Sequence, residues 1–129
     1  MFRKIILSLS VALLATSFGL GAQKTTTVEF ERMIQDIGIF PRDSCLITSI
    51  FEFKNTGDAK LYFYTASPDC PCVSVKLPAV PVNPGDSGRN IVYYDGRLKA
   101  PGDVRHWIYL SSNADPATFR IRIVGYMTE

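Results

Sequence analysis

Three cysteines are the residues of this chain with the most distinctive chemistry, and two of them are separated by a single proline. Cys70, Pro71 and Cys72 stand between two predicted strands, and Cys45 is the third thiol. Two thiolates at this spacing can form a disulfide or bind a soft metal ion such as Cu(I) or Zn²⁺. The pair lacks both the Cys-x-x-Cys spacing and the βαβ surroundings of a thioredoxin-like enzyme.

The pairing of the three disulfide candidates, Cys45, Cys70 and Cys72, stays open at this point. Chain entropy favours a bridge between Cys45 and Cys70, worth about 3.5 kcal/mol, over a Cys70–Cys72 bridge, worth about 1.6 kcal/mol before strain. Cys45 is predicted early in a strand on its inward face, and the sequence does not place it beside the loop. If it is out of reach, it is a small buried core residue.

The sequence does not place any other side chain where it would complete a metal or catalytic site. Zinc prefers four ligands, and His106, the single histidine, is predicted to face inward on a strand distant from the cysteine loop. Cys70 and Cys72 therefore remain only an alternative metal site. His106 has no positioned partner for general-base catalysis, and the aspartates beside Gly, Pro or Cys suit turns. We predict a non-enzymatic protein without a cofactor.

The first 22 residues have the layout of a secretory signal peptide. Arg3 and Lys4 precede a short apolar run, Ile5–Leu14, and small residues follow up to Ala22. The run is shorter than the roughly 20 residues of a membrane span, so no span is expected after cleavage near Ala22. Removal of two basic residues and no acid lowers the formal net charge from +2 to zero. A nucleic-acid partner is not expected, because such proteins need a basic face.

Alternation of apolar and polar residues dominates the rest of the chain. Strands are predicted at 26–33, 44–54, 61–64, 73–77, 89–94, 104–110 and 119–126, with a turn region at 36–43. Seven or eight short strands in one domain predict an all-β, antiparallel β-sandwich of the immunoglobulin-like kind, with a closed barrel as the alternative. Asn55 is assigned to the turn after the second of these strands.

One predicted outward face carries aromatic and cationic side chains. Its candidate partner-binding residues are Tyr62, Tyr64, Trp107, Tyr109, Arg120 and Arg122. Exposed aromatics and arginines have the composition of interface hot spots. The same residues could instead stabilise the sheet through cross-strand pairs, or lie under the first strand. A protein or a cell-surface glycan is the predicted partner.

Several turn motifs follow one another in a recognisable order. They are Asp36-Ile37-Gly38, FEFKNTG at 51–57, the Cys-x-Cys loop, NPGDSG at 83–88, a lysine followed by Pro101-Gly102, and Ser112-Asn113. From Asp36 to Gly125 this set resembles the secreted bacterial family catalogued as the domain of unknown function numbered 1573. The family loop usually reads Ser-Cys-Gly-Cys, whereas Asp69-Cys70-Pro71-Cys72 stands here and fixes φ at the middle residue.

The resemblance implies an immunoglobulin-like sandwich, similar to ASH/MSP-like interaction domains, in exported proteins of Gram-negative bacteria. It implies no established reaction. We therefore expect a signal peptide at 1–22, an N-terminal extension with an extra strand at 23–35, and the immunoglobulin-like domain at 36–129. The predicted function is an exported, non-enzymatic module, periplasmic or extracellular, that binds a protein or surface partner. The alternative is a periplasmic metal- or thiol-handling protein that uses the Cys-Pro-Cys loop.

Overall fold

The computed structural model describes residues 25–129, and eight strands make up more than half of these residues. The predicted signal peptide lies outside these residues. The strands are β1 (Val28–Phe30), β2 (Ile34–Pro41), β3 (Leu46–Asn55), β4 (Phe63–Pro68), β5 (Val73–Lys76), β6 (Ser87–Asp95), β7 (Gly102–Ser112) and β8 (Thr118–Thr128). A short 3-10 turn, Arg42–Ser44, joins β2 to β3. Over the same residues, no helix has the length and apolar character needed to cross a membrane.

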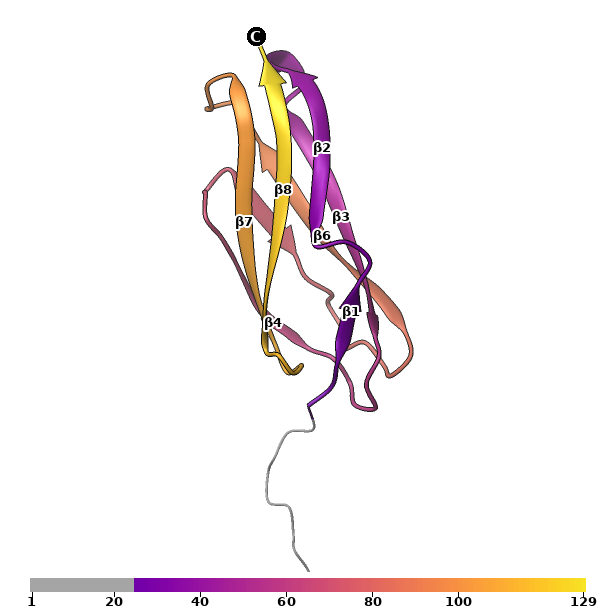
Figure 1. The fold of residues 1–129 in the computed structure, drawn as a ribbon. Helices are drawn as coiled ribbons and strands as arrows, with labels where there is room; N and C mark the ends of the chain where they lie inside the picture. The colour runs from indigo at the N-terminus through magenta and orange to yellow at the C-terminus, as the bar shows by residue number, and fades with distance from the viewer. Residues whose placement is uncertain (1–24) are drawn as a thin grey trace, which may run out of the picture.

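The strands form two four-stranded sheets that face each other, in the orders β1-β3-β6-β5 and β2-β8-β7-β4. Figure 1 shows β2, β8 and β7 in one layer with β3 and β6 behind them. This confirms the predicted immunoglobulin-like sandwich. One pairing departs from the antiparallel expectation: β2 lies parallel to β8, so the second sheet is mixed.

The turn predicted at 36–43 is wrong, because most of this segment belongs to β2. The register against β8 shifts between Asp36 and Ile39, which marks a β-bulge. Gly38 has a φ of 88° and donates its backbone N–H to Oδ1 of Asp36, 2.8 Å away. Gly38 is therefore a bulge glycine inside an edge strand, although its local sequence is typical of a turn.

Long apolar side chains from both sheets fill the space between them. On β7 and β8, Ile108 pairs with Ile121, and both are fully buried. The next pair, Trp107 and Arg122, lies on the outer face. This register is the one that the alternation predicted, because a shift by one residue would bury the arginines.

Asn55 ends β3 and also takes part in the predicted turn, because its Oδ1 accepts the backbone N–H of Gly57 at 3.2 Å. It is fully buried. Its side-chain amide donates to the carbonyl oxygens of Ala59 and Val82, and its Oδ1 accepts from the hydroxyl of Thr26, 2.6 Å away. Asn55 thus joins three separate segments at one end of the sandwich.

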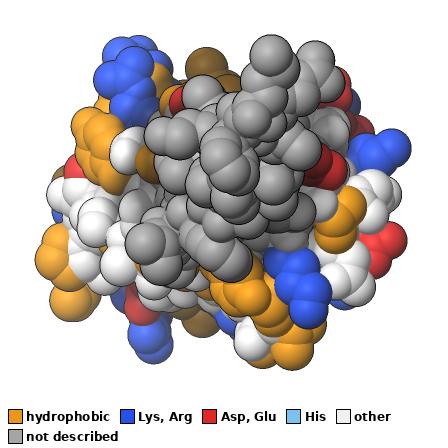
Figure 2. Space-filling view, turned by 90° about the horizontal axis from the view of Figure 1, so that it is seen from below, with side chains coloured by type: hydrophobic (Ala, Val, Ile, Leu, Met, Phe, Trp, Pro, Cys, Tyr) orange, Lys and Arg blue, Asp and Glu red, His pale blue; other side chains and the backbone are white. Residues whose placement is uncertain are grey.

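Figure 2 views this end of the molecule, the end nearest β1. Around the visible rim, hydrophobic side chains alternate with lysine or arginine and with acidic side chains. Charges of both signs are therefore interspersed at this end.

Candidate functional site

The Cys-Pro-Cys loop crosses from one sheet to the other. It connects β4, at the edge of one sheet, to β5, at the edge of the opposite sheet. Before the loop, Asp69 donates its backbone N–H to the carbonyl of Trp107 on β7, at 3.0 Å. After the proline, the carbonyl of Cys72 accepts from the backbone N–H of Asp95, at 2.8 Å. Each end of the loop is therefore anchored to a different sheet.

The structure joins Cys70 and Cys72 by a disulfide, with their Cα atoms 5.1 Å apart. Cys70 is buried and Cys72 is half-buried. Within the loop, the backbone N–H of Cys72 lies 3.2 Å from Sγ of Cys70, and the N–H of Val73 donates to the Cys70 carbonyl at 3.1 Å. The loop is thus a tight turn that brings both sulfur atoms to the same side.

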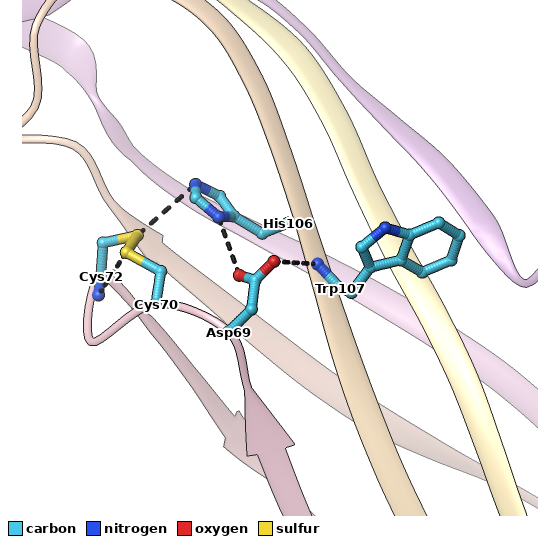
Figure 3. Close-up of polar contacts among 5 residues, drawn as sticks. All are labelled: Asp69, Cys70, Cys72, His106 and Trp107. Carbon is cyan, nitrogen blue, oxygen red and sulfur yellow. Dashed lines mark hydrogen bonds and ion pairs between the residues drawn. A yellow bond between two sulfur atoms is a disulfide. The ribbon is translucent and has the colours of Figure 1, made fainter.

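His106 lies beside these sulfurs, so the prediction that it is distant from the loop is wrong. Its Nε2 is 3.6 Å from Sγ of Cys72, and its Nδ1 is 3.0 Å from Oδ1 of Asp69 (Figure 3). Oδ2 of Asp69 accepts the backbone N–H of Trp107, also at 3.0 Å. The Asp69 carboxylate therefore orients the imidazole and is itself held by the backbone of β7.

Cys45 is a buried free thiol, so of the pairings that the sequence left open the bridge to Cys45 is not formed. It lies in the core near Tyr94, whose ring stacks on His106 with centroids 5.8 Å apart. Burial raises the pKa of the Tyr94 phenol, and the nearby Cys45 and Asp95 add to this rise. Tyr94 consequently remains neutral around neutral pH and forms one wall against the imidazole.

On its exposed side, Cys72 borders a shallow hollow of about 390 Å³. Pro71, Leu46 and Tyr93 contribute to its lining. Leu46 is 64% exposed, so apolar surface accompanies half-buried Cys72. Of the two cysteines, Cys72 is thus the one that borders this hollow, whereas Cys70 is buried.

The predicted partner surface is partly assembled by the sheet register. Trp107 pairs with Arg122, and Tyr109 pairs with Arg120, on adjacent strands β7 and β8. The guanidinium carbons of Arg120 and Arg122 lie 4.0 and 4.6 Å from the centre of the Trp107 ring. These four residues form a continuous cluster, which we call the Trp107 cluster.

Tyr62 and Tyr64 do not belong to this cluster. Tyr62 precedes β4, and Tyr64 lies at the irregularity of β4 between Phe63 and Thr65. Both side chains are exposed as predicted, but neither residue pairs with Trp107 or Tyr109, because Tyr109 faces Ser67 instead. The six predicted residues thus divide into the four of the Trp107 cluster and two tyrosines at the beginning of the edge strand, one just before β4 and one within it.

An acidic hollow on the other sheet has no counterpart in the sequence predictions. It measures about 540 Å³, and three glutamates, Glu29, Glu31 and Glu52, line it together with Lys54 and Arg89. A hydrogen bond that protonated Glu52 donates to Glu31, and repulsion by the charge of Glu31, raise the pKa of Glu52 above the ordinary value. The three glutamates come from two segments that are distant in sequence, so only the pairing of β1 with β3 brings them together.

The Asp69–His106 pair is the principal feature that sequence reasoning missed. The sequence assigns Asp69 to a turn because it precedes the Cys-Pro-Cys loop. Its side chain instead reaches β7, which begins 33 residues later at Gly102. One available signal was the inward position of His106 between buried Val104 and Ile108, since a histidine facing the core needs a polar partner.

Comparison with known proteins agrees with this fold. The family model described as "Protein of unknown function (DUF1573)" matches residues 28–127. Among curated proteins, no match to the chain is found.

Solved structures provide further likenesses. A protein of unknown function from Porphyromonas gingivalis W83 has a TM-score of 0.71 and 18% identity, over 84% of this chain and 50% of that protein. The ASH/PapD-like domain 7 of human CEP192 has a TM-score of 0.63 and 14% identity, over 81% of this chain and 87% of that one. The periplasmic chaperone SfaE gives 0.53 and 11%, over 78% and 56%. The chain thus spans half the length of the P. gingivalis protein, and the likenesses show a shared fold.

Proposed function

The chain belongs to the DUF1573 family of proteins of unknown function, and we propose that it is an exported, non-enzymatic binding module. Its partner is a protein that docks on the outer face of β7 and β8. Support comes from the resemblance of the fold to the ASH/PapD-like domain and to a periplasmic chaperone. The signal-like layout of residues 1–22 supports export.

The proposal is based on the arrangement of the residues in the Trp107 cluster. Two guanidinium groups flank one indole ring, and Tyr109 beside them is 44% exposed. Such stacking holds long side chains in place and contributes about 0.5–1 kcal/mol per pair at exposed sites. The cluster is therefore ordered before a partner arrives, which lowers the entropy cost of binding.

The charge of the cluster indicates the chemistry of the partner. In the part of the chain that the structure describes, neither Arg120 nor Arg122 has a carboxylate within ion-pair distance. Nε of Arg122 is buried, so the exposed Arg120 is the better placed of the two to bind an acidic group, which arginine does in a planar, two-pronged geometry. A protein segment that combines acidic side chains with an apolar contact for Trp107 and Tyr109 fits this surface.

Capture from an extract of the source bacterium tests the proposal. The purified protein is immobilised, and bound proteins are quantified by mass spectrometry for the wild type and for the Trp107→Ser and Tyr109→Ser variants. A specific partner should be enriched by the wild type and reduced at least tenfold by either variant. Tyr93→Ser is the matched control, because Tyr93 is an exposed tyrosine on the opposite sheet.

The control should capture the partner as the wild type does. Both substitutions lie on the outer face, so the variants should fold. Circular dichroism checks this. Equal capture by the wild type and by the Trp107 and Tyr109 variants would show that the partner binds elsewhere.

A further inference from the structure

We propose that Cys70, Cys72 and His106 bind one Cu(I) ion when the disulfide between the two cysteines is reduced. The Sγ atoms of both cysteines and a ring nitrogen of His106 lie within 4.8 Å of one another. They come from the loop between β4 and β5 and from the middle of β7. This site is separate from the Trp107 cluster and does not depend on it.

The distance between histidine and sulfur fits two ligands of one ion. Metal–sulfur bonds of about 2.3 Å and metal–nitrogen bonds of about 2.0–2.1 Å, at angles between tetrahedral and trigonal, place the two ligand atoms roughly 3.6–3.8 Å apart. Nε2 of His106 is 3.6 Å from Sγ of Cys72. His106 therefore needs little movement to bind an ion together with this sulfur.

The hydrogen bonds around His106 direct the correct nitrogen toward the sulfurs. Nδ1 donates its proton to Oδ1 of Asp69, so the lone pair of neutral imidazole is on Nε2, which faces Cys72. A carboxylate that holds the far nitrogen of a ligating histidine is the usual second layer of a metal site. The stacked ring of Tyr94 limits rotation of the imidazole further.

The ligand set selects a soft ion that accepts three donors. Two thiolates and one imidazole suit Cu(I), which accepts three donors; structural zinc sites use a fourth protein ligand, and a zinc ion here would need a water molecule in the fourth position. Both oxygens of Asp69 are already engaged, one with His106 and one with the Trp107 backbone. Among the described residues, no further Cys, His, Asp or Glu joins this group of three.

The disulfide makes the site dependent on redox state. In the oxidised protein, the two sulfurs are joined by the S–S bond and neither is a thiolate, which is the form that binds a metal ion strongly. A dithiol donor reduces it by exchange: one thiolate attacks Sγ of Cys72, the less buried of the two cysteines, and Cys70 leaves as a thiolate. The second thiol of the donor then displaces Cys72, and the donor departs as a disulfide. Binding of Cu(I) to the resulting dithiol releases two protons.

Anaerobic titration with Cu(I) in competition with a coloured chelator, bicinchoninate, tests this proposal. The full chain is compared in its oxidised form and after reduction with dithiothreitol and desalting. The reduced protein should take up one Cu(I) ion per chain, and the oxidised protein none at the same chelator concentration. X-ray absorption of the loaded protein should show two sulfur ligands and one nitrogen ligand.

Four variants identify the ligands. A double Cys70→Ser, Cys72→Ser variant should lose binding, whereas Cys45→Ala should retain it, because Cys45 is a buried thiol outside the group. His106→Asn should lower the affinity at least tenfold and remove the nitrogen signal. Asp69→Asn should lower it about 10- to 100-fold while the nitrogen signal persists.

Binding that is unchanged in the double cysteine variant, or a loaded wild type that shows no nitrogen ligand, would refute this site. Neither result bears on capture of a partner by the Trp107 cluster, so the two proposals fail independently.

Discussion

Glu31 and Glu52 illustrate how two ordinary surface residues acquire unusual chemistry through a single contact. Glu52 lies on β3 next to Glu31, which follows β1, and the two carboxyl groups share a hydrogen bond. Sharing requires that one of them carries a proton, so the pKa of Glu52 rises, and Arg89 opposes this rise only in part. Folding thus favours the protonated carboxyl.

We predict that Glu31→Gln lowers the pKa of Glu52 toward its ordinary value, because the hydrogen bond with the Glu31 carboxylate and the negative charge of Glu31 are both lost. The measurement is a carboxyl ¹³C NMR titration of Glu52 in both proteins. Glu29→Gln is the control, since Glu29 lines the same hollow but does not contribute to the shift. An unchanged Glu52 pKa in the Glu31 variant would contradict the shared hydrogen bond.

The same contact determines the sign of a pH effect on stability. The folded protein holds the Glu52 proton more tightly than the unfolded chain does. The favourable contribution is therefore present at low pH and is lost as the pH rises through the raised pKa. In the Glu31 variant this loss should disappear, which denaturant titrations across the acidic range can measure.

For single residues, the sequence predicts which face of a strand a side chain occupies better than it predicts which distant residues the side chain contacts. The alternation correctly predicted exposed Tyr109 and buried Phe53, because the side to which a strand residue points depends on its neighbours alone. The contact of Asp69 with His106 depends on how a loop lies against β7, and Asn55 is buried by segments far along the chain. Neither could be predicted from local pattern.

Strand β2 is the element that the sequence predicted least well. Gly38 and Pro41 are both turn-forming residues, yet they lie in an eight-residue strand. The bulge at Asp36 and Ile39 interrupts the alternation on which strand prediction depends. Parallel pairing with β8 adds a contact between the beginning and the end of the described chain, and no local pattern reports such a contact.

We predict that Gly125→Ala loosens β2 from β8. A Cβ atom at this position would lie 2.7 Å from Cγ1 of Ile37 and 2.8 Å from the carbonyl oxygen of Gly38. The backbone of the bulge must therefore shift, and the expected loss of stability is about 1–3 kcal/mol. Urea denaturation measures this loss, and hydrogen exchange should show faster exchange of amides in β2.

An exposed site on the same strand provides the control for this change. Thr118 is exposed at the start of β8, so Thr118→Ala should alter stability by less than about 0.5 kcal/mol. If Gly125→Ala has an equally small effect on stability and leaves the β2 amides protected from hydrogen exchange, close packing of the bulge against β8 is not what holds this edge strand.

At the scale of the whole molecule, the two sheets depend on one another through a group of aromatic rings. Phe53 of β3 lies 4.9 Å from Phe63 of β4, and Phe30 of β1 lies 5.2 Å from Phe119 of β8, measured between ring centroids. Each pair links one sheet to the other. The sandwich should therefore unfold as one cooperative unit, as small single domains generally do.

Phe53→Ala tests this dependence from the sheet that lacks tryptophan. The substitution removes a ring that is 2% exposed, and it should cost about 3–5 kcal/mol. Trp107, the single tryptophan, reports on the opposite sheet. Its fluorescence transition in urea should shift to lower concentration together with the far-UV circular dichroism, because loss of packing on β3 also removes support from β4.

A milder substitution at the same position separates lost packing from a general disturbance. Phe53→Leu keeps an apolar side chain in contact with Phe63, so it should shift both transitions in the same direction by a smaller amount. If the Trp107 transition stays in place while the circular dichroism signal moves, the sheets unfold separately. The rings between them would then fill space without coupling the two halves of the sandwich.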